Sequence, residues 1–349
     1  MCLSTISKKK KKINQKKDTP PFNTTRQRQN MKILTVATQG KDYYAVFVRQ
    51  CAALGLPLTT LGWGEAWRGF NWKLKQIARH LETLPEDEVV VVLDAYDVIP
   101  LAAADTVMAR FLAFKRPIVM STELEPTGLS GYMHARVFPS KRDAVTGETL
   151  HLNAGAYMGY AGYVARLYRE LYASFDGSDD RLDDQRMMMH LHTHDNAFFR
   201  AHVAFDVHST IFLTVTPGLF GFSSGVDAVK DAHFVRSPTT TTEIVSERTG
   251  LTPCFVHGPS SANLDWLLAI YGIQCSADEQ KPTQDVLRHY GKMFEYSQYF
   301  WPEILVAIFI IAIIVVAVMV FKRRHDVPFN PSRSISLTKC VHTRALEKT

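Results

Sequence analysis

The sequence predicts an α/β domain with a mostly parallel central sheet flanked by helices, followed by one C-terminal apolar helix. Three observations support this fold class. From residue 32 onward, short runs of β-branched residues alternate with segments of helical spacing. Residues 88–93 (EVVVVL) are apolar on both faces, as is typical of a central parallel strand. Residues 304–321 form an uninterrupted run of 18 uncharged, apolar residues.

The individual elements follow from the period of the apolar residues. Strands are predicted at 32–38, 56–61, 88–93 and 117–121, and helices at 43–54, 74–84, 105–114, 162–174 and 184–194. Residues 123–150 are predicted to form a long loop, and residues 203–256 to hold short strands. Because ligands of parallel sheets bind at the carboxyl ends of strands, the residues after positions 36 and 93 are the first candidates for a site.

Charge and composition divide the chain into five segments. The prediction is a disordered basic arm at 1–30, a folded domain at 31–275, a linker and juxtamembrane segment at 276–301, a transmembrane helix at 302–321 and a basic tail at 322–349. The arm holds nine Lys and Arg residues against one acid, and the tail holds seven against two. The combined positive charge of these two segments exceeds the net charge of the whole chain, which is +6. The folded part is therefore acidic, and nucleic acid is not expected as a partner.

The C-terminal apolar run predicts a single-pass membrane protein. Tyr296, Tyr299, Phe300 and Trp301 precede the run as an interfacial aromatic belt would, and three basic residues follow it. The positive-inside rule would place the basic end in the cytosol, whereas the N-terminal region lacks the apolar core of a signal peptide. These two indications conflict, so the side of the membrane that the folded domain faces stays open.

Two carboxylates follow the strongest predicted strand. Asp94 and Asp97 lie at its carboxyl end, where burial of acids is unfavourable unless a ligand binds them. A divalent cation together with a diphosphate is a suitable ligand, since hard cations bridge carboxylates to phosphate oxygens. The alternative is a turn in which both acids cap a helix.

Three further segments carry candidate site residues. His257 and Gly258 follow an apolar run, and a neutral imidazole can supply a third ligand for Mn²⁺, although a lone histidine is more often structural. Asn153 lies among small residues (LNAGAYMGY), which predicts either a turn that a ligand approaches closely or a tight turn entering a strand. Asp183 and Asp184 open a helix, where they either interact with the helix dipole or orient an acceptor hydroxyl.

In order and spacing, these segments resemble the glycosyltransferase domain of procollagen lysyl hydroxylases and the related collagen glucosyl- and galactosyltransferases. The resemblance runs from about residue 32 to 272. The matching segments are TVAT (35–38), LGWGEAW (61–67), DAYDV (94–98), STE (121–123), LNAGAYMGYA (152–161), DDQ (183–185), the 206–212 segment and HG (257–258). No single motif is decisive, but eight in this order are specific.

The resemblance implies a GT-A fold, a UDP-sugar donor such as UDP-glucose or UDP-galactose, and Mn²⁺ or Mg²⁺ as the cofactor. By position it implies three groups of residues: the metal ligands Asp94, Asp97 and His257; the donor-binding residues Thr38, Lys73, Tyr96, Asn153 and Gly258; and the catalytic residues Asp183 and Asp184 near the transferred sugar and the acceptor. The expected partners are that donor, a protein or glycan acceptor such as hydroxylysine of a collagen-like chain, and a membrane. A homodimer is left open.

One segment departs from the family in an informative way. The family pattern H-G-N-G-P-x-K reads HGPSSAN at 257–263, so a phosphate-contacting lysine is missing. The expected function is a metal-dependent transfer of glucose or galactose from a UDP-sugar to a hydroxyl group. The alternative is a catalytically weak GT-A domain that serves as a membrane-bound binding or assembly module. A dehydrogenase is set aside, because no G-x-G-x-x-G follows the first strand.

Overall fold

The computed structural model describes residues 31–123, 136, 140–142, 149–215, 234–236, 244–246, 249–259, 262–280 and 301–325. The chain divides into two compact units, Met1–Gly291 and Lys292–Thr349. The predicted arm at 1–30, most of the predicted loop at 123–150, most of the linker at 276–301 and most of the basic tail lie outside the described residues.

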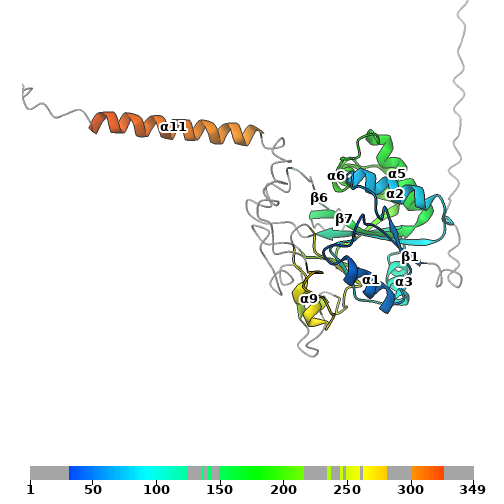
Figure 1. Cartoon of the computed structure of the whole chain (residues 1–349). Coiled ribbons are helices and arrows are strands. Elements are labelled where there is room, and N and C mark those ends of the chain that lie inside the picture. The colour runs from blue at the N-terminus through cyan, green and yellow to red at the C-terminus, as the bar shows by residue number, and fades with distance from the viewer. Residues whose placement is uncertain are drawn as a thin grey trace, which may run out of the picture. The chain divides into compact units, whose positions relative to one another are not determined.

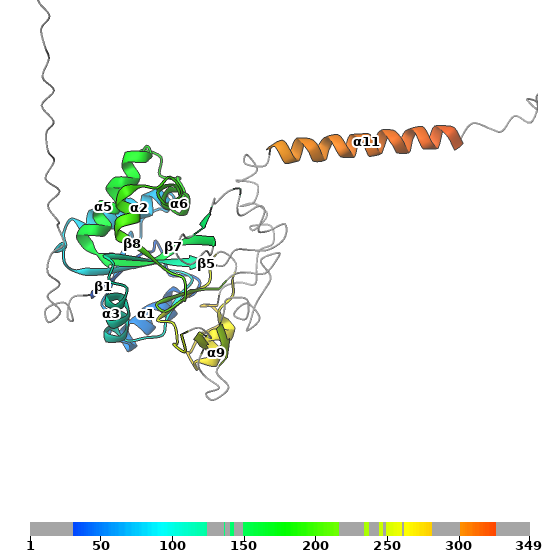
Figure 2. The same cartoon turned by 180° about the vertical axis from the view of Figure 1, so that it is seen from behind.

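A mixed sheet forms the centre of the first unit (Figures 1 and 2). Its strand order is β2-β1-β3-β7-β5-β8, with β6 paired to β7. The strands are β1 (Met31–Val36), β2 (Leu58–Leu61), β3 (Val89–Leu93), β5 (Ile118–Glu123), β6 (Lys141–Arg142), β7 (Thr149–Tyr160) and β8 (Val203–Asp206). Strand β1 pairs in parallel with β2 and β3, and β5 pairs in parallel with β8.

Strand β7 is the exception to the expected parallel arrangement. It lies antiparallel between β3 and β5, with Val91 opposite Met158 and Glu123 opposite His151. Strand β5 ends at the same edge of the sheet at which β7 begins, so the connection needs no crossover helix. The segment around Asn153, predicted as a turn, is therefore the interior of a twelve-residue strand.

Helices cover both faces of this sheet. Because side chains alternate along a strand, Val90 and Val92 face one core and Val89 and Val91 face the other. The first core is covered by α2 (Phe70–Leu81), α5 (Ala161–Ser174), α6 (Asp184–Thr193) and α7 (Ala197–His202), and the second by α1 (Tyr44–Ala53) and α3 (Ala104–Ala113). Figure 1 shows α2, α5 and α6 on one side of the sheet and α1 and α3 on the other.

A small second sheet brings a distant part of the chain to the end of β3. Its strand order is β4 (Val98–Pro100), β12 (Phe255–His257) and β9 (Phe212–Thr214). A third apolar core, which includes α9 (Asp265–Ile270), packs against it. Strands β10 (Phe234–Arg236) and β11 (Ile244–Ser246) form a separate antiparallel pair.

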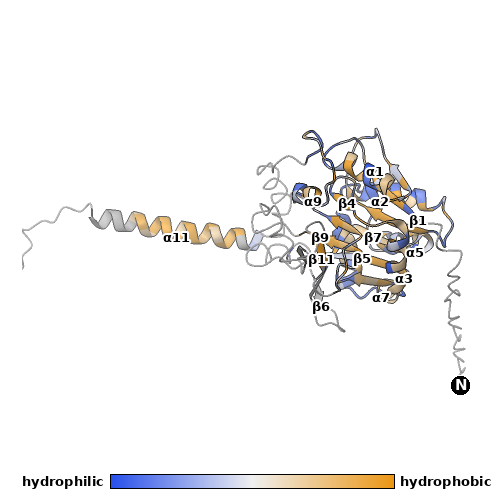
Figure 3. Ribbon diagram, turned by 90° about the horizontal axis from the view of Figure 1, so that it is seen from below, coloured by the Kyte–Doolittle hydropathy of each residue, from blue (hydrophilic) through white to orange (hydrophobic). Residues whose placement is uncertain are grey.

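The second unit holds one helix, α11 (Trp301–His325), among its described residues. The helix is strongly apolar (Figure 3). Over the described part of the chain, no helix has both the length and the apolar character that a membrane crossing requires. This finding contradicts the predicted transmembrane helix at 302–321 and, with it, the predicted single-pass membrane localisation.

Candidate active site

Three residues from distant parts of the sequence meet at the carboxyl end of β3. Asp94 directly follows this strand, and its N–H donates to the carbonyl of Gly155 at 2.8 Å. His257 is the last residue of β12 and stands in register with Val98, the residue after Asp97. The pairing of β12 with β4 therefore places the imidazole next to the two carboxylates, although about 160 residues separate them in the sequence.

The three side chains lie close enough together that they could hold one metal ion. One ligand atom from each of Asp94, Asp97 and His257 lies within 4.8 Å of the others. The Nε2 atom of His257 is 3.3 Å from Oδ1 of Asp97 and 3.9 Å from Oδ2 of Asp94. The imidazole is buried, whereas the Asp94 and Asp97 side chains are 31% and 17% exposed, so solvent and ligands reach the carboxylate side of the cluster.

Glycine is required at position 155 to make room for this cluster. A Cβ atom there would stand 2.3 Å from Cε1 of His257 and 2.7 Å from Oδ2 of Asp94. Both distances are far below van der Waals contact, so Gly155 lets strand β7 pass directly behind the candidate ligands. In the sequence, Gly155 belongs to a small-residue segment, and no local pattern marks it as part of the site.

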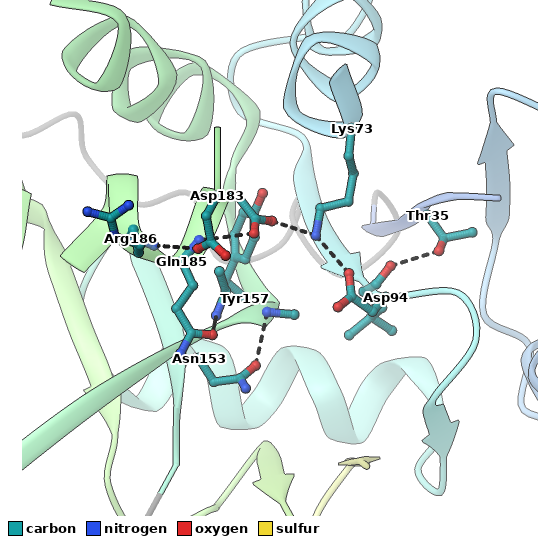
Figure 4. A network of polar contacts seen from close by, with 12 residues as sticks. Thr35, Lys73, Asp94, Asn153, Tyr157, Asp183, Gln185 and Arg186 are labelled. Carbon is teal, nitrogen blue, oxygen red and sulfur yellow. Dashed lines mark hydrogen bonds and ion pairs between the residues drawn. The ribbon is translucent and has the colours of Figure 1, made fainter. Parts of the chain in front are cut away.

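Lys73 on α2 connects the cluster to α6. Its ammonium lies 2.8 Å from Oδ1 of Asp94 and 2.6 Å from Oδ2 of Asp184, and Figure 4 shows it reaching towards Asp94. Burial opposes the charge on Lys73, but the attraction of Asp184 and Asp94 outweighs burial and raises the pKa of Lys73. Burial also raises the pKa of Asp184 to about 6, against the opposing attraction of Lys73.

The two acids at the start of α6 have different surroundings. Asp183 is the N-cap of the helix and accepts the N–H of Arg186 at 2.8 Å. Its capping position corresponds to the structural alternative considered for this motif. Asp184 is 5% exposed and faces Lys73 rather than solvent. Asp184 is thus joined to the candidate metal ligand Asp94 through Lys73.

Thr38 and Tyr96 lie in contact with each other. The Tyr96 hydroxyl accepts the backbone N–H of Thr38 at 3.0 Å, and the ammonium of Lys41 lies 4.7 Å from the centre of the Tyr96 ring. The structure thereby brings together the two residues expected to contact uridine. Gly258 also joins the site, because its N–H donates to the carbonyl of Asp97 at 2.8 Å.

Asn153 on β7 lies behind the imidazole. Its Oδ1 is 3.0 Å from Nδ1 of His257, and its side chain is buried. Two residues that the sequence analysis did not select as site residues surround it: Glu123 at the end of β5 and Gln185 in the first turn of α6. All ten predicted site residues thus lie in one connected region of the first unit.

The balance of charge in this region is negative. Lys73 lies at ion-pairing distance from Asp94 and Asp184, and Asp97 lies close to Asp94 in the cluster with His257. When all three acids are ionised, the excess charge is that of two carboxylates. Two carboxylates and one neutral imidazole form a suitable ligand set for a divalent cation that also binds phosphate.

A mixed α/β domain with a parallel-rich sheet and an Asp-x-x-Asp motif after β3 fits a GT-A-like architecture. The comparison with known families gives the particular group. The PLOD GT domain family matches residues 27–266, and the chain belongs to this family.

Known relatives agree with this assignment. The procollagen-lysine,2-oxoglutarate 5-dioxygenase of Drosophila melanogaster is 25% identical over 257 residues, which are 69% of this chain and 32% of the relative. The human multifunctional procollagen lysine hydroxylase and glycosyltransferase LH3 is 25% identical over 171 residues, which are 45% of this chain and 22% of the relative. The chain thus spans about a third or less of the length of these relatives.

Among solved structures, a glycosyltransferase involved in the glycosylation of the major capsid of PBCV-1 is similar over 66% of this chain and 95% of its own. The sequence identity is 14% and the TM-score is 0.35.

Proposed function

We propose that this protein transfers a hexose, glucose or galactose, from a UDP-sugar to a hydroxyl group in a reaction that depends on a divalent metal ion. The observation that carries the proposal is the convergence of Asp94, Asp97 and His257 within 4.8 Å at the carboxyl end of the central strand. Sheets of this kind bind their ligands at that edge.

The ligand set fits Mn²⁺ or Mg²⁺. Carboxylate oxygens suit both ions, and a neutral imidazole favours Mn²⁺ over Mg²⁺. When bound, the ion would supply positive charge to the diphosphate that leaves as the glycosidic bond of the donor breaks. Asp94, Asp97 and His257 would hold it, with Gly155 providing the space.

The remaining site residues would position the donor. Thr38 and Tyr96, joined by the hydrogen bond from the Thr38 N–H, would contact the uridine. Lys73 holds Asp94 and Asp184 in place and would supply positive charge to the donor phosphates. Asp184, fixed by Lys73, would orient the sugar or the acceptor hydroxyl, while Asp183 fixes the start of α6 on which Asp184 stands.

A lysine side chain that carries a hydroxyl group is the proposed acceptor. The names of the two relatives describe proteins that act on procollagen lysine, and LH3 combines hydroxylase with glycosyltransferase activity. We extend to this chain only the glycosyl transfer, because its similarity covers the PLOD GT domain. A collagen-like peptide containing hydroxylysine is therefore the first acceptor to test.

One sequence feature favours the alternative of a catalytically weak domain that binds ligands without turning them over. The segment HGPSSAN at 257–263 lacks the lysine of the family pattern, which would reduce contact with the donor phosphates. The two proposals differ in whether UDP is released at all.

The test is a donor screen with the full-length protein, in which released UDP is measured with Mn²⁺, with Mg²⁺ and with EDTA. UDP-glucose or UDP-galactose should release UDP in Mn²⁺, EDTA should abolish the release, and Asp97→Asn should reduce it at least 100-fold. Asp87→Asn, a change in an exposed turn before β3, is the control and should behave as the wild type. Tight UDP binding without turnover of any donor would favour the binding module, and full activity of Asp97→Asn would refute the metal assignment.

A further inference from the structure

The amide group of Asn153 is placed between a backbone N–H group and the imidazole of a metal-ligand candidate. Its Oδ1 accepts the N–H of Gly155 at 2.9 Å and lies 3.0 Å from Nδ1 of His257. Asn153 is 1% exposed and His257 is 2% exposed, so water does not compete for these contacts. A misdirected amide would therefore leave a buried polar group without a partner.

Two independent contacts determine which way the amide points. A backbone N–H is only ever a donor, so the Asn153 atom that faces Gly155 must be the oxygen. The other end of the amide, Nδ2, lies 3.3 Å from Oε2 of Glu123, and a carboxylate oxygen accepts hydrogen bonds. Both neighbours require the same orientation, with the oxygen directed towards the imidazole.

The orientation of the amide determines the tautomer of the histidine. Since Oδ1 of Asn153 can only accept, Nδ1 of His257 must carry the proton that it donates. In a neutral imidazole the proton on Nδ1 leaves the lone pair on Nε2. Nε2 is the atom that faces Asp97 and Asp94, at 3.3 and 3.9 Å.

We propose that Asn153 is a positioning residue that holds His257 as the Nδ1–H tautomer, so that Nε2 presents its lone pair to a divalent cation. The proposal rests on the proposed function, because the Nδ1–H tautomer matters only if His257 binds a metal ion. Partners of this kind behind a metal-ligating histidine fix both the tautomer and the orientation of the ring.

Glu123 and Gln185 extend this arrangement to helix α6. The Nε2 group of Gln185 donates to Oε1 of Glu123 at 2.6 Å, and Figure 4 shows Gln185 beside Asn153. The preceding residue, Asp184, contacts Lys73, which in turn contacts Asp94. The first turn of α6 is thus connected to the imidazole through Asn153 and to a carboxylate ligand through Lys73.

The direct test is ¹⁵N NMR of the histidine ring in the metal-free, full-length protein. Spectra of the wild type should show His257 protonated on Nδ1, and the His257→Gln variant identifies which signal belongs to this residue. In Asn153→Leu, which keeps the approximate size but removes the acceptor, a substantial fraction should shift to the Nε2–H tautomer. An Nε2–H tautomer in the wild type would overturn the proposal, even if Asn153→Leu failed to fold.

Metal affinity provides the second measurement, by titration of Mn²⁺ followed with electron paramagnetic resonance. The dissociation constant should rise about 10- to 100-fold in Asn153→Leu and less in Gln185→Leu, which removes the contacts of Gln185 with Glu123 and with the Ala154 N–H but leaves the bond between Asn153 and His257. Asn71→Leu is the matched control, because Asn71 is equally buried but bonds the carbonyls of Gly177 and Asp179. It should lower stability and leave the Mn²⁺ affinity of the folded protein unchanged.

These outcomes separate the inference from the function on which it rests. An unchanged tautomer and unchanged Mn²⁺ affinity in Asn153→Leu would refute the role of Asn153 while sugar transfer persisted. Absence of sugar transfer in a wild type that binds Mn²⁺ through an Nδ1–H histidine would refute only the proposed reaction.

Discussion

Gly155 and His257 approach each other so closely that a single methyl group could not fit between them: a Cβ on residue 155 would lie 2.3 Å from the imidazole Cε1. The glycine is in the middle of β7 and the histidine ends β12, so two sheets touch at this point. The contact places the main chain of β7 behind the metal-ligand candidates, with the Gly155 carbonyl accepting the N–H of Asp94.

The first prediction follows from this contact. In Gly155→Ala the new methyl group should displace the imidazole and Asp94 from each other, because both lie within 3 Å of it. We expect Mn²⁺ affinity to fall at least tenfold and UDP release to fall with it, as measured by isothermal titration and a UDP assay. Gly40→Ala is the control for affinity, since a Cβ there meets Trp63 at 3.7 Å and Tyr44 at 4.0 Å, both ordinary van der Waals distances. Wild-type affinity in Gly155→Ala would show that the ligands lie elsewhere.

Part of this site is predictable from sequence and part is not, for physical reasons. Asp94 and Asp97 directly follow an apolar strand, and the rule on carboxyl ends of strands selects them locally. His257 is chosen over the other histidines only through the family resemblance, because its place depends on the pairing of β12 with β4. The need for glycine at 155 comes from a tertiary contact that no local pattern reports.

The same distinction applies to the fold. The position of β3 follows from its composition, and the alternation of elements predicts both helical layers. Helix α2, in contrast, starts at Phe70 instead of the predicted residue 74. The N–H groups of Asn71 and Trp72 donate to the carbonyl of Asp180, which satisfies the first turn of the helix from outside it. The antiparallel direction of β7 likewise depends on a strand connection that the periodicity does not encode.

The second prediction concerns the buried ammonium of Lys73. Lys73→Met would leave the carboxylates of Asp94 and Asp184 close together without a cation. Removing one partner of a buried ion pair typically costs about 3–5 kcal/mol, and we expect a loss of this size in urea-induced unfolding without metal. Adding Asp184→Asn should restore part of the lost free energy of unfolding, because one of the two carboxylates left without a cation is then neutral.

The matched control for Lys73 is its neighbour Lys75 on the same helix. Lys75 pairs with Asp180, and the two side chains are 26% and 27% exposed. Solvent screens such a pair, so Lys75→Met should cost less than about 1 kcal/mol. Equal effects of the two substitutions would contradict the special position assigned to Lys73.

The third prediction concerns Asp206, which stabilises strand β9, the neighbour of the strand β12 that ends at His257. Its buried carboxylate accepts the backbone N–H groups of Thr210, Ile211 and Phe212 at 2.7, 2.6 and 2.8 Å. These bonds fix the start of β9, which pairs in parallel with β12 and places Thr214 opposite His257.

In Asp206→Asn an NH₂ group must face at least one of the three N–H donors. The unfolding free energy should fall by about 3 kcal/mol, as expected when a buried charged hydrogen bond is lost. Chemical denaturation measures the change, and Asp87→Asn at the surface should stay within about 0.5 kcal/mol of the wild type. If Asp206→Asn were as stable as this control, the carboxylate would not be what fixes residues 210–212.

The last prediction is a pH dependence of stability that arises from Glu279. Arg49 on α1 forms a two-point ion pair with this carboxylate, and its Nη2 also donates to the carbonyl of Gln274 at 3.0 Å. Hydrogen bonding by Arg49 lowers the pKa of Glu279 to about 2. Since the pKa is lower in the folded than in the unfolded state, the contribution to stability is complete above about pH 4.5 and is lost as the pH falls towards about 2.

Glu279→Gln should therefore unfold more readily at neutral pH, and its stability should fall less steeply than that of the wild type between pH 4.5 and 2. Glu82→Gln, at the exposed end of α2, should keep the wild-type slope. Parallel stability curves for Glu279→Gln and the wild type would show that the ion pair with Arg49 does not hold residues 274–279 against α1.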